Sequence, residues 1–404
     1  MSTSRDRRAR RRTRRTGPGL GRRTGPGLGR RLVAAFAAIS IAIATTAVAG
    51  TAVAGAGSAG GGGPGGPGGG QPRVTTLARG LVGPLHLDVS PGWMGPSVLV
   101  SQSFAGSISR LTKDGVTDIV TSPGAFTGGV AAGPFGTVMY LIGDDSGTFL
   151  KLRLPNGNTR TIADLGAYEK ANNPDQINHY GLQGATPECI AQLPPELPIA
   201  PYTGEVDSNP YELTVTPFGT YVADAGGNDI LFVEWTGRIR TVSVLPPRPM
   251  VIPPEATALG VPACAIGLTM NFEPVPTDVE FGPDHQLYVS SLPGGPEDAS
   301  LGARGGVFRV NPNSGRSKLI GSGFLGASNL AVAPNGTVYV AELFGNRVSR
   351  LCNGGPVPVA ELTQPAGLEW AGGRLYATTD ALGPEVPEGQ QPPPPDGKVV
   401  SFRP

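Results

Sequence analysis

The sequence contains few of the side chains that enzymes most often use for catalysis. Three histidines and three cysteines are spread over 404 residues, and no cysteine pair has the spacing of a zinc ligand set. There is no H-E-x-x-H, no G-x-S-x-G, no Walker loop, and no G-x-G-x-x-G after a strand. The common zinc-protease, serine-hydrolase and nucleotide-binding signatures are therefore excluded.

Charge and aromatic content are also low. Charged residues make up 16% and aromatics 6% of the chain, whereas a charged share of roughly 25% is typical. In contrast, 62 Gly and 42 Pro together form about a quarter of the sequence. This composition favours a turn-rich β protein over a helical bundle.

The small net charge hides an uneven distribution. Residues 1–31 contain twelve Arg and a single acid, so the rest of the chain is net acidic although the total charge is +1. A protein that binds nucleic acid needs Lys and Arg to neutralise phosphates. The acidic body argues against a nucleic-acid partner.

The first residues have the composition of an export signal. The Arg-rich start is followed by an uncharged, Ala-rich run over residues 32–49, which ends in small residues. This order is typical of a secretory signal peptide, which we expect at residues 1–49. The alternative is an uncleaved membrane anchor, since the run approaches the ~20 residues that cross a bilayer. Residues 50–72 are Gly/Pro-rich and are expected to be a linker.

From residue 73 onward one pattern recurs six times. A strand of alternating apolar residues ends near a Pro, a Gly-containing turn follows, and a second strand comes next. We therefore predict an all-β, six-bladed β-propeller with four-stranded blades over residues 73–404. The innermost strands are expected at residues 84–90, 127–133, 210–216, 276–282, 327–333 and 365–370.

The two ends of this region predict how the ring closes. The sixth unit ends with the chain at its third strand, residues 399–402, and lacks a fourth. Residues 73–77 form a strand that has no unit of its own. We expect this N-terminal strand to complete the last blade, because closure hides strand edges that would otherwise pair with other chains.

Two long insertions interrupt the repeat, at residues 168–206 and 246–275. Both connect an outer strand to the next inner strand, so both are expected on the same face. Each carries one cysteine, and in an exported protein this predicts a disulfide between Cys189 and Cys264. The alternative is two separate thiols. Cys352 at a hairpin tip is left over and is expected to be free.

Polar residues occupy one matching position on four of the six predicted inner strands. They are His86, Glu212, Asp278 and Asn329. Side chains at this position are expected to line the entrance of the central channel. The remaining two strands have Gly129 and Gly367 there.

Two roles are open for this channel-lining set. Glu212, Asp278 and Asn329 have the oxygen donors that Ca²⁺ or another divalent cation prefers, and His86 or Asp278 would then act as a general base. Alternatively, the polar side chains hold channel water or bond neighbouring backbone.

Turns after the second strands repeat a further pattern. Asp224 and Asn228 in blade three occupy the same slots as Glu342 and Asn346 in blade five. This equivalence favours a structural role, with the acid capping backbone amides of its own turn.

Three segments resemble the ScyD/ScyE family of exported bacterial proteins. They are YEKANNPD at 168–175, DSNPY at 207–211 and VADAGGND at 222–229. The resemblance extends over essentially all of residues 73–404 and implies a TolB-like propeller outside the cytoplasm. It implies no reaction.

Looser similarities involve NHL-type repeats and the gluconolactonase/regucalcin superfamily. The latter implies a divalent ion held by acidic and amide groups at the channel mouth, matching Glu212, Asp278 and Asn329. The glycines of two blades depart from that pattern.

These observations predict a secreted binding or scaffold protein that holds an unidentified protein or small molecule on the insertion-bearing face. The alternative is a divalent-metal-dependent hydrolase of the lactonase or esterase type, with its site at the channel mouth. A membrane is expected as a partner only through an uncleaved N-terminal segment.

Overall fold

The computed structural model describes residues 71–90, 97–195, 197, 199–296, 299–383 and 393–404. The predicted signal peptide and nearly all of the predicted linker lie outside the described residues. Within the described part of the chain, no helix is both long enough and apolar enough to cross a membrane.

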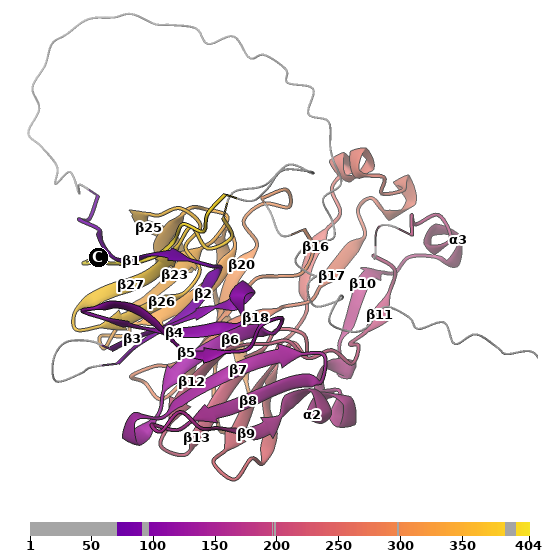
Figure 1. The fold of residues 1–404 in the computed structure, drawn as a ribbon. Coiled ribbons are helices and arrows are strands. Elements are labelled where there is room, and N and C mark those ends of the chain that lie inside the picture. Colours follow the sequence, from indigo (N-terminus) through magenta and orange to yellow (C-terminus); the bar gives the residue numbers. More distant parts are fainter. Residues whose placement is uncertain (1–70, 91–96, 196, 198, 297–298, 384–392) are drawn as a thin grey trace, which may run out of the picture. The chain divides into compact units, whose positions relative to one another are not determined.

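The described residues form seven four-stranded antiparallel sheets (Figure 1). Five of them are built from four consecutive strands, and we number these blades one to five. Blade one consists of β2 (Pro84–Ser90), β3 (Ser97–Gln102), β4 (Ser107–Thr112) and β5 (Gly115–Thr121). Blade two consists of β6 (Phe126–Ala132), β7 (Val138–Asp144), β8 (Gly147–Arg153) and β9 (Thr159–Asp164). Blade three consists of β12 (Pro210–Thr216), β13 (Gly219–Asp224), β14 (Asp229–Glu234) and β15 (Ile239–Val244).

The remaining blades follow the same order. Blade four consists of β18 (Pro276–Phe281), β19 (Leu287–Ser291), β20 (Gly305–Val310) and β21 (Ser317–Phe324). Blade five consists of β22 (Ala327–Val332), β23 (Val338–Glu342), β24 (Arg347–Cys352) and β25 (Gly355–Glu361). Blade six consists of β26 (Leu368–Ala371), β27 (Arg374–Thr379), β28 (Gly397–Phe402) and β1 (Thr75–Leu81).

The blades are arranged as a closed ring. The first strands β2, β6, β12, β18, β22 and β26 contact one another in this order, and β26 contacts β2. Each junction between consecutive blades contains a buried apolar cluster, as where Leu141 of blade two packs with Leu213 and Val222 of blade three. Both faces of each blade are therefore buried against the neighbouring blades. The predicted β-propeller fold is confirmed.

Blade six joins the two ends of the described chain. β1 pairs with β28 in the order β1-β28-β27-β26, with Thr75 opposite Ser401 and Leu81 opposite Gly397. Ala78 and Leu81 of β1 are buried in the cluster between blades six and one. The N-terminal strand thus completes the last blade as predicted, and it extends beyond residue 77 to Leu81.

The seventh sheet is formed by the two insertions. It has the order β11-β10-β17-β16, with bounds β10 (His179–Gln183), β11 (Tyr202–Thr203), β16 (Arg248–Val251) and β17 (Thr269–Phe272). We call residues 165–206 and 246–275 the inserted module. It also contains α2 (Leu165–Asn172) and α3 (Pro187–Ile190), and short 3-10 helices include η3 (Pro174–Ile177).

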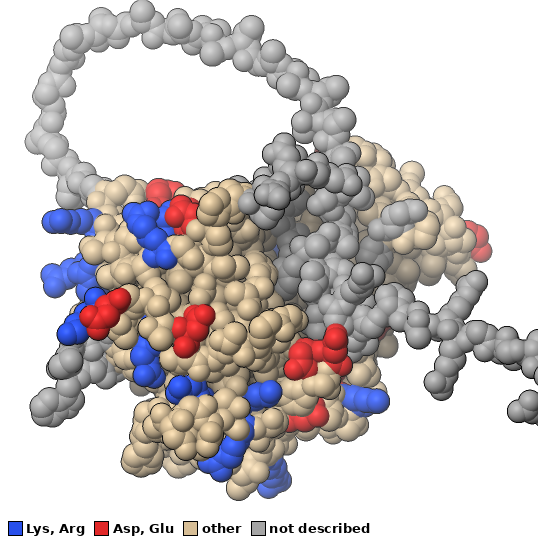
Figure 2. Space-filling view, viewed as in Figure 1, with Lys and Arg blue, Asp and Glu red and all other residues tan. Residues whose placement is uncertain are grey.

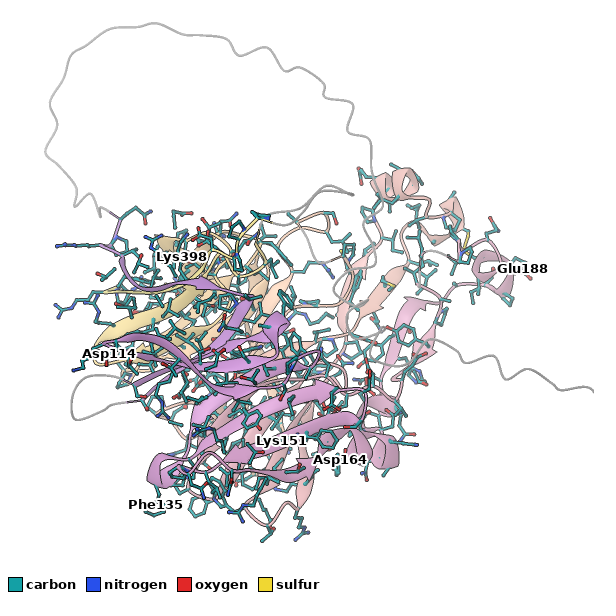
Figure 3. All side chains as sticks on the ribbon, viewed as in Figure 1. Asp114, Phe135, Lys151, Asp164, Glu188 and Lys398 are labelled. Carbon is teal, nitrogen blue, oxygen red and sulfur yellow. A yellow bond between two sulfur atoms is a disulfide. The ribbon has the colours of Figure 1, made fainter. Side chains whose placement is uncertain are left out.

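The predicted disulfide joins the two halves of this module. Cys189 lies in α3 and is bonded to Cys264, 75 residues later. Figure 3 shows the bond in yellow close to the labelled Glu188. Cys189 packs with Leu182, Met270 and Phe272, so the module has a small apolar core of its own. Cys352 is free.

Candidate functional site

The inner strands bring three of the four predicted channel residues into direct contact. The Nδ1 atom of His86 lies 2.8 Å from Oε2 of Glu212. The amide of Asn329 donates to the same carboxylate oxygen over 3.4 Å. All three side chains are buried, although they come from blades one, three and five. The matching positions on the strands therefore do converge.

A glycine makes room for the central carboxylate. A Cβ atom at Gly129 would lie 2.0 Å from Oε1 of Glu212 and 2.8 Å from its Cα. Any larger residue would therefore collide with β12. Because residue 129 in blade two is a glycine, the Glu212 side chain has room to reach His86.

The polar side chains also connect neighbouring blades through backbone amides. Asp278 accepts from Leu330 N over 2.8 Å with one oxygen and from Val279 N over 2.7 Å with the other. Asn329 in turn accepts from Leu368 N over 2.9 Å. These bonds tie β18 to β22 and β22 to β26. A structural role for Asp278 and Asn329 follows directly from this geometry.

A second layer of carboxylates lies two residues further along the same strands. Asp88, Glu280 and Glu369 line a central cavity of about 190 Å³ together with Glu212, Asp278 and Asn329. His86 is fully buried behind Glu212 and does not line this cavity. The sequence contained the signal for the second layer, since residues two apart on a strand face the same way. Only the first layer was predicted.

The channel is strongly acidic in composition, and burial changes how its groups titrate. Burial raises the pKa of Glu212 to about 8 and that of Asp88 to about 7. Burial and then the neighbouring carboxylates raise the pKa values of Asp278, Glu280 and Glu369 well above their usual range. No Lys or Arg is among the described residues that line the cavity. Protons or a cation must therefore offset this charge.

Burial has the opposite effect on the histidine. It lowers the pKa of His86 to about 3, so the imidazole is neutral at physiological pH. Its Nε2 atom has no hydrogen-bond partner. The Glu212 carboxyl group holds Nδ1 in place, and a pKa of about 3 makes this buried imidazole a weak base.

A metal site at the channel stays a prediction. Glu212, Asp278 and Asn329 offer carboxylate and amide oxygens, which suit a hard divalent cation. As the side chains stand, no group of three or more His, Cys, Asp and Glu among the described residues is arranged to hold a metal ion. Because Asp278 uses both oxygens for backbone amides, an ion there would share oxygens that already accept hydrogen bonds.

We predict that the channel carboxylates make stability fall as pH rises. A carboxyl whose pKa is raised by folding keeps its proton in the folded state above the pH at which the unfolded chain releases it. Stability is therefore highest below about pH 4 for each such group and is lost as pH approaches the folded value, by up to ~1.4 kcal/mol per pH unit and group. Melting temperatures between pH 5 and 8 should show a smaller decline in a Glu280→Gln/Glu369→Gln variant.

Thr214→Val is the matched control, because Thr214 lines the same cavity without titrating there. It should keep the wild-type pH dependence. An unchanged slope in the double variant would contradict the prediction.

Asp224 of blade three caps amides of its own turn as expected, whereas Glu342 of blade five accepts from an amide outside its turn. Asp224 Oδ1 accepts from the amides of Asn209, Gly226 and Gly227 over 2.7, 3.2 and 3.1 Å. Glu342 accepts from Leu325 N over 2.7 Å and also pairs with Arg347. Asn228 and Asn346 both have positive φ, as tight turns require.

Comparisons with known proteins support the fold but assign neither a family nor an activity. No protein-family model and no curated protein matches the chain. A gluconolactonase from Xanthomonas campestris is similar in structure, with a TM-score of 0.51, 12% identity, and coverage of 82% of this chain and 90% of the other. The fold is a β-propeller.

Two further solved structures are similar at lower scores. A virginiamycin B lyase from Staphylococcus aureus has a TM-score of 0.43 and 16% identity, and 76% of this chain and 81% of that chain are covered. The PQQ-bound aldose sugar dehydrogenase from Streptomyces coelicolor has a TM-score of 0.47 and 16% identity, with coverage of 82% and 98%.

Proposed function

We propose that this chain is an extracytoplasmic β-propeller binding protein of the ScyD/ScyE type. Its ligand or partner is held on the face that bears the inserted module. Export by residues 1–49 is part of this proposal, and the disulfide agrees with an oxidising compartment.

The observation that carries the proposal is the firm attachment of the inserted module. The disulfide joins the two insertions to each other, and the buried Asn228 of blade three bonds both of them. Its amide donates to Asp175 over 3.0 Å, and its oxygen accepts from Val275 N over 3.1 Å. A rigid element held on a propeller face is suited to preorganised binding.

The channel is a poorer place for such a ligand. Its cavity of about 190 Å³ is below the roughly 300–1,000 Å³ that small-molecule sites occupy. The exterior offers more room: Figure 2 shows a surface made mostly of uncharged residues. On the module, Ile177, Val206 and Val251 are more than half exposed.

The proposal is tested by finding where a ligand protects the chain. A thermal-shift screen of peptides, oligosaccharides and aromatic metabolites would supply binders, and hydrogen exchange would map them. We expect protection within residues 168–206 and 246–275, and weaker binding by Ile177→Glu and Val251→Glu. Phe135→Glu is the control, because this residue is 96% exposed on a turn at the inner-strand end opposite the insertions. Protection confined to β2, β6, β12 and β18 would contradict the proposal.

A second candidate function is hydrolysis of a lactone or similar ester at the channel mouth. The observation that favours it is the acidic cavity of about 190 Å³, which Glu212, Asp278 and Asn329 line. Asp278 would take a proton from water, and the buried His86 would hold Glu212 in place through their hydrogen bond. A divalent cation held by Glu212, Asp278 and Asn329 would polarise the carbonyl when bound.

This candidate predicts a specific loss of activity. With a panel of lactones and aryl esters, in Ca²⁺, Mg²⁺, Mn²⁺ or Zn²⁺, Asp278→Asn should lower kcat/KM by about 100-fold or more. Thr214→Val should leave it unchanged. Turnover that survives Asp278→Asn, or the absence of turnover by the wild type, would remove hydrolysis from consideration.

A further inference from the structure

A second group of buried carboxylates lies outside the channel, where α2 of the inserted module meets blade three. Its centre is Gly227, in the turn between β13 and β14. A Cβ atom on this glycine would lie 3.2 Å from Oε2 of Glu169 and 3.5 Å from both Cγ of Asp224 and Oδ1 of Asp229. Three carboxyl groups therefore surround one small space. We call Glu169, Asp224 and Asp229 the turn cluster.

The local fold brings Glu169 to this position. Asp164, labelled in Figure 3, caps α2 by accepting from Ala167 N over 2.8 Å. The helix then places Glu169 toward the protein, where only 2% of the residue is exposed. Because α2 follows β9 of blade two, the carboxylate reaches blade three from the preceding blade.

The oxygens of this cluster are incompletely satisfied. Glu169 Oε1 and Asp229 Oδ1 are buried and have no hydrogen-bond partner. Asp229 has no exposed surface, and its other oxygen accepts only from Thr241, over 3.2 Å. Asp175, also buried, has an unpartnered Oδ1. Carboxylates are rarely buried without a cation or a full set of hydrogen bonds.

Comparison among the blades shows what is missing. Asp224 and Asp229 lie directly opposite each other on β13 and β14. The matching pair in blade five is Glu342 opposite Arg347, and their hydrogen bonds measure 2.7 and 3.0 Å. At the position where blade five has Arg347, blade three has a second carboxylate, Asp229. Like charges in directly opposed positions destabilise a sheet.

We propose that the turn cluster binds a calcium ion that joins the inserted module to blade three. Glu169 and Asp229 supply the unpartnered oxygens, and Asp224 lies beside them. Calcium accepts six to eight oxygen ligands, and water and backbone carbonyls complete such shells. The charge of the ion offsets the carboxylates of blade three, as the charge of Arg347 offsets Glu342 in blade five.

The present side-chain positions do not yet enclose an ion, since no three His, Cys, Asp or Glu groups among the described residues are arranged to hold one. Mutual repulsion keeps unbound carboxylates apart, and a bound cation draws them together. Glu169 can move because Oε1 makes no hydrogen bond. This inference is independent of the proposed ligand and of the channel.

The experiment measures calcium binding by the full-length chain after removal of metals with a chelator. We expect about one calcium per chain in equilibrium dialysis, and a melting temperature that rises by about 4 °C at a hundredfold excess over Kd. Glu169→Gln and Asp229→Asn should each abolish binding. In chelator both variants should melt no lower than the wild type, because each removes a repulsive charge.

Two control variants test whether the calcium response comes from the turn cluster. One controls for a general loss of stability, and the other controls for an ion bound in the channel. Glu342→Gln breaks the ion pair of blade five and should lower stability while it keeps the calcium response. Asp278→Asn alters the channel and should also keep it. A wild type that binds no calcium would overturn the proposal. So would binding that survives Glu169→Gln and Asp229→Asn but is lost in Asp278→Asn, because the ion would then lie in the channel.

Discussion

A chain that begins at Gly83 should melt about 7 °C below a chain that begins at Gln71. The shorter chain lacks β1, whose Ala78 and Leu81 are buried between blades six and one. Burial of one leucine contributes about 2 kcal/mol, and the hydrogen bonds to β28 contribute roughly 1 kcal/mol each. A loss of about 5 kcal/mol corresponds to a shift of this size in a domain of this length. Differential scanning calorimetry of both chains measures it.

The loss should be accompanied by aggregation, because β28 becomes an unpaired edge strand. The chain that begins at Gln71 is the matched control, since it keeps β1 and lacks only residues 1–70. Equal melting temperatures for the two chains would show that the ring does not depend on its N-terminal strand.

Removal of the disulfide is the second large effect that we expect. The Cys189–Cys264 bond closes a loop with a sequence separation of 75 residues. In the chain-entropy description, such a loop stabilises the folded state by about 4 kcal/mol. Cys189→Ser/Cys264→Ser should therefore loosen the inserted module, whose own apolar core is small. Hydrogen exchange at β10, β16 and β17 should accelerate by two to three orders of magnitude.

The propeller strands should keep their protection in this variant, because no blade contains either cysteine. Cys352→Ser is the control and should change neither region, since Cys352 is a free thiol. Uniform acceleration across the blades would contradict the view of the module as a separately stabilised unit.

The sequence was sufficient for the fold because its information is local and repeated. Period-two alternation, Asn-Gly and Asp-Gly turns and a missing fourth strand predict the sheets and their closure. The disulfide was also predictable, because both insertions connect outer to inner strands and so share a face.

The candidate sites depend on distances between segments that the sequence does not specify. Matching strand positions singled out His86, Glu212, Asp278 and Asn329, but the bonds from Asp278 and Asn329 to neighbouring strands require the inter-blade register. Asp88, Glu280 and Glu369 were missed although period-two counting reaches them. No single stretch of the sequence predicts the turn cluster, because Glu169 and Asp229 are sixty residues apart.

The pairing of β1 with β28 also determines when folding can finish. Thr75 faces Ser401, so the first strand has no partner until the ribosome has made almost the entire chain. At ~5–20 residues per second this takes tens of seconds. Throughout that time the apolar side of β1 and the outer edge of blade six stay uncovered. Completion of this fold is therefore a late, long-range event, and nascent chains are vulnerable to association until their last residues emerge.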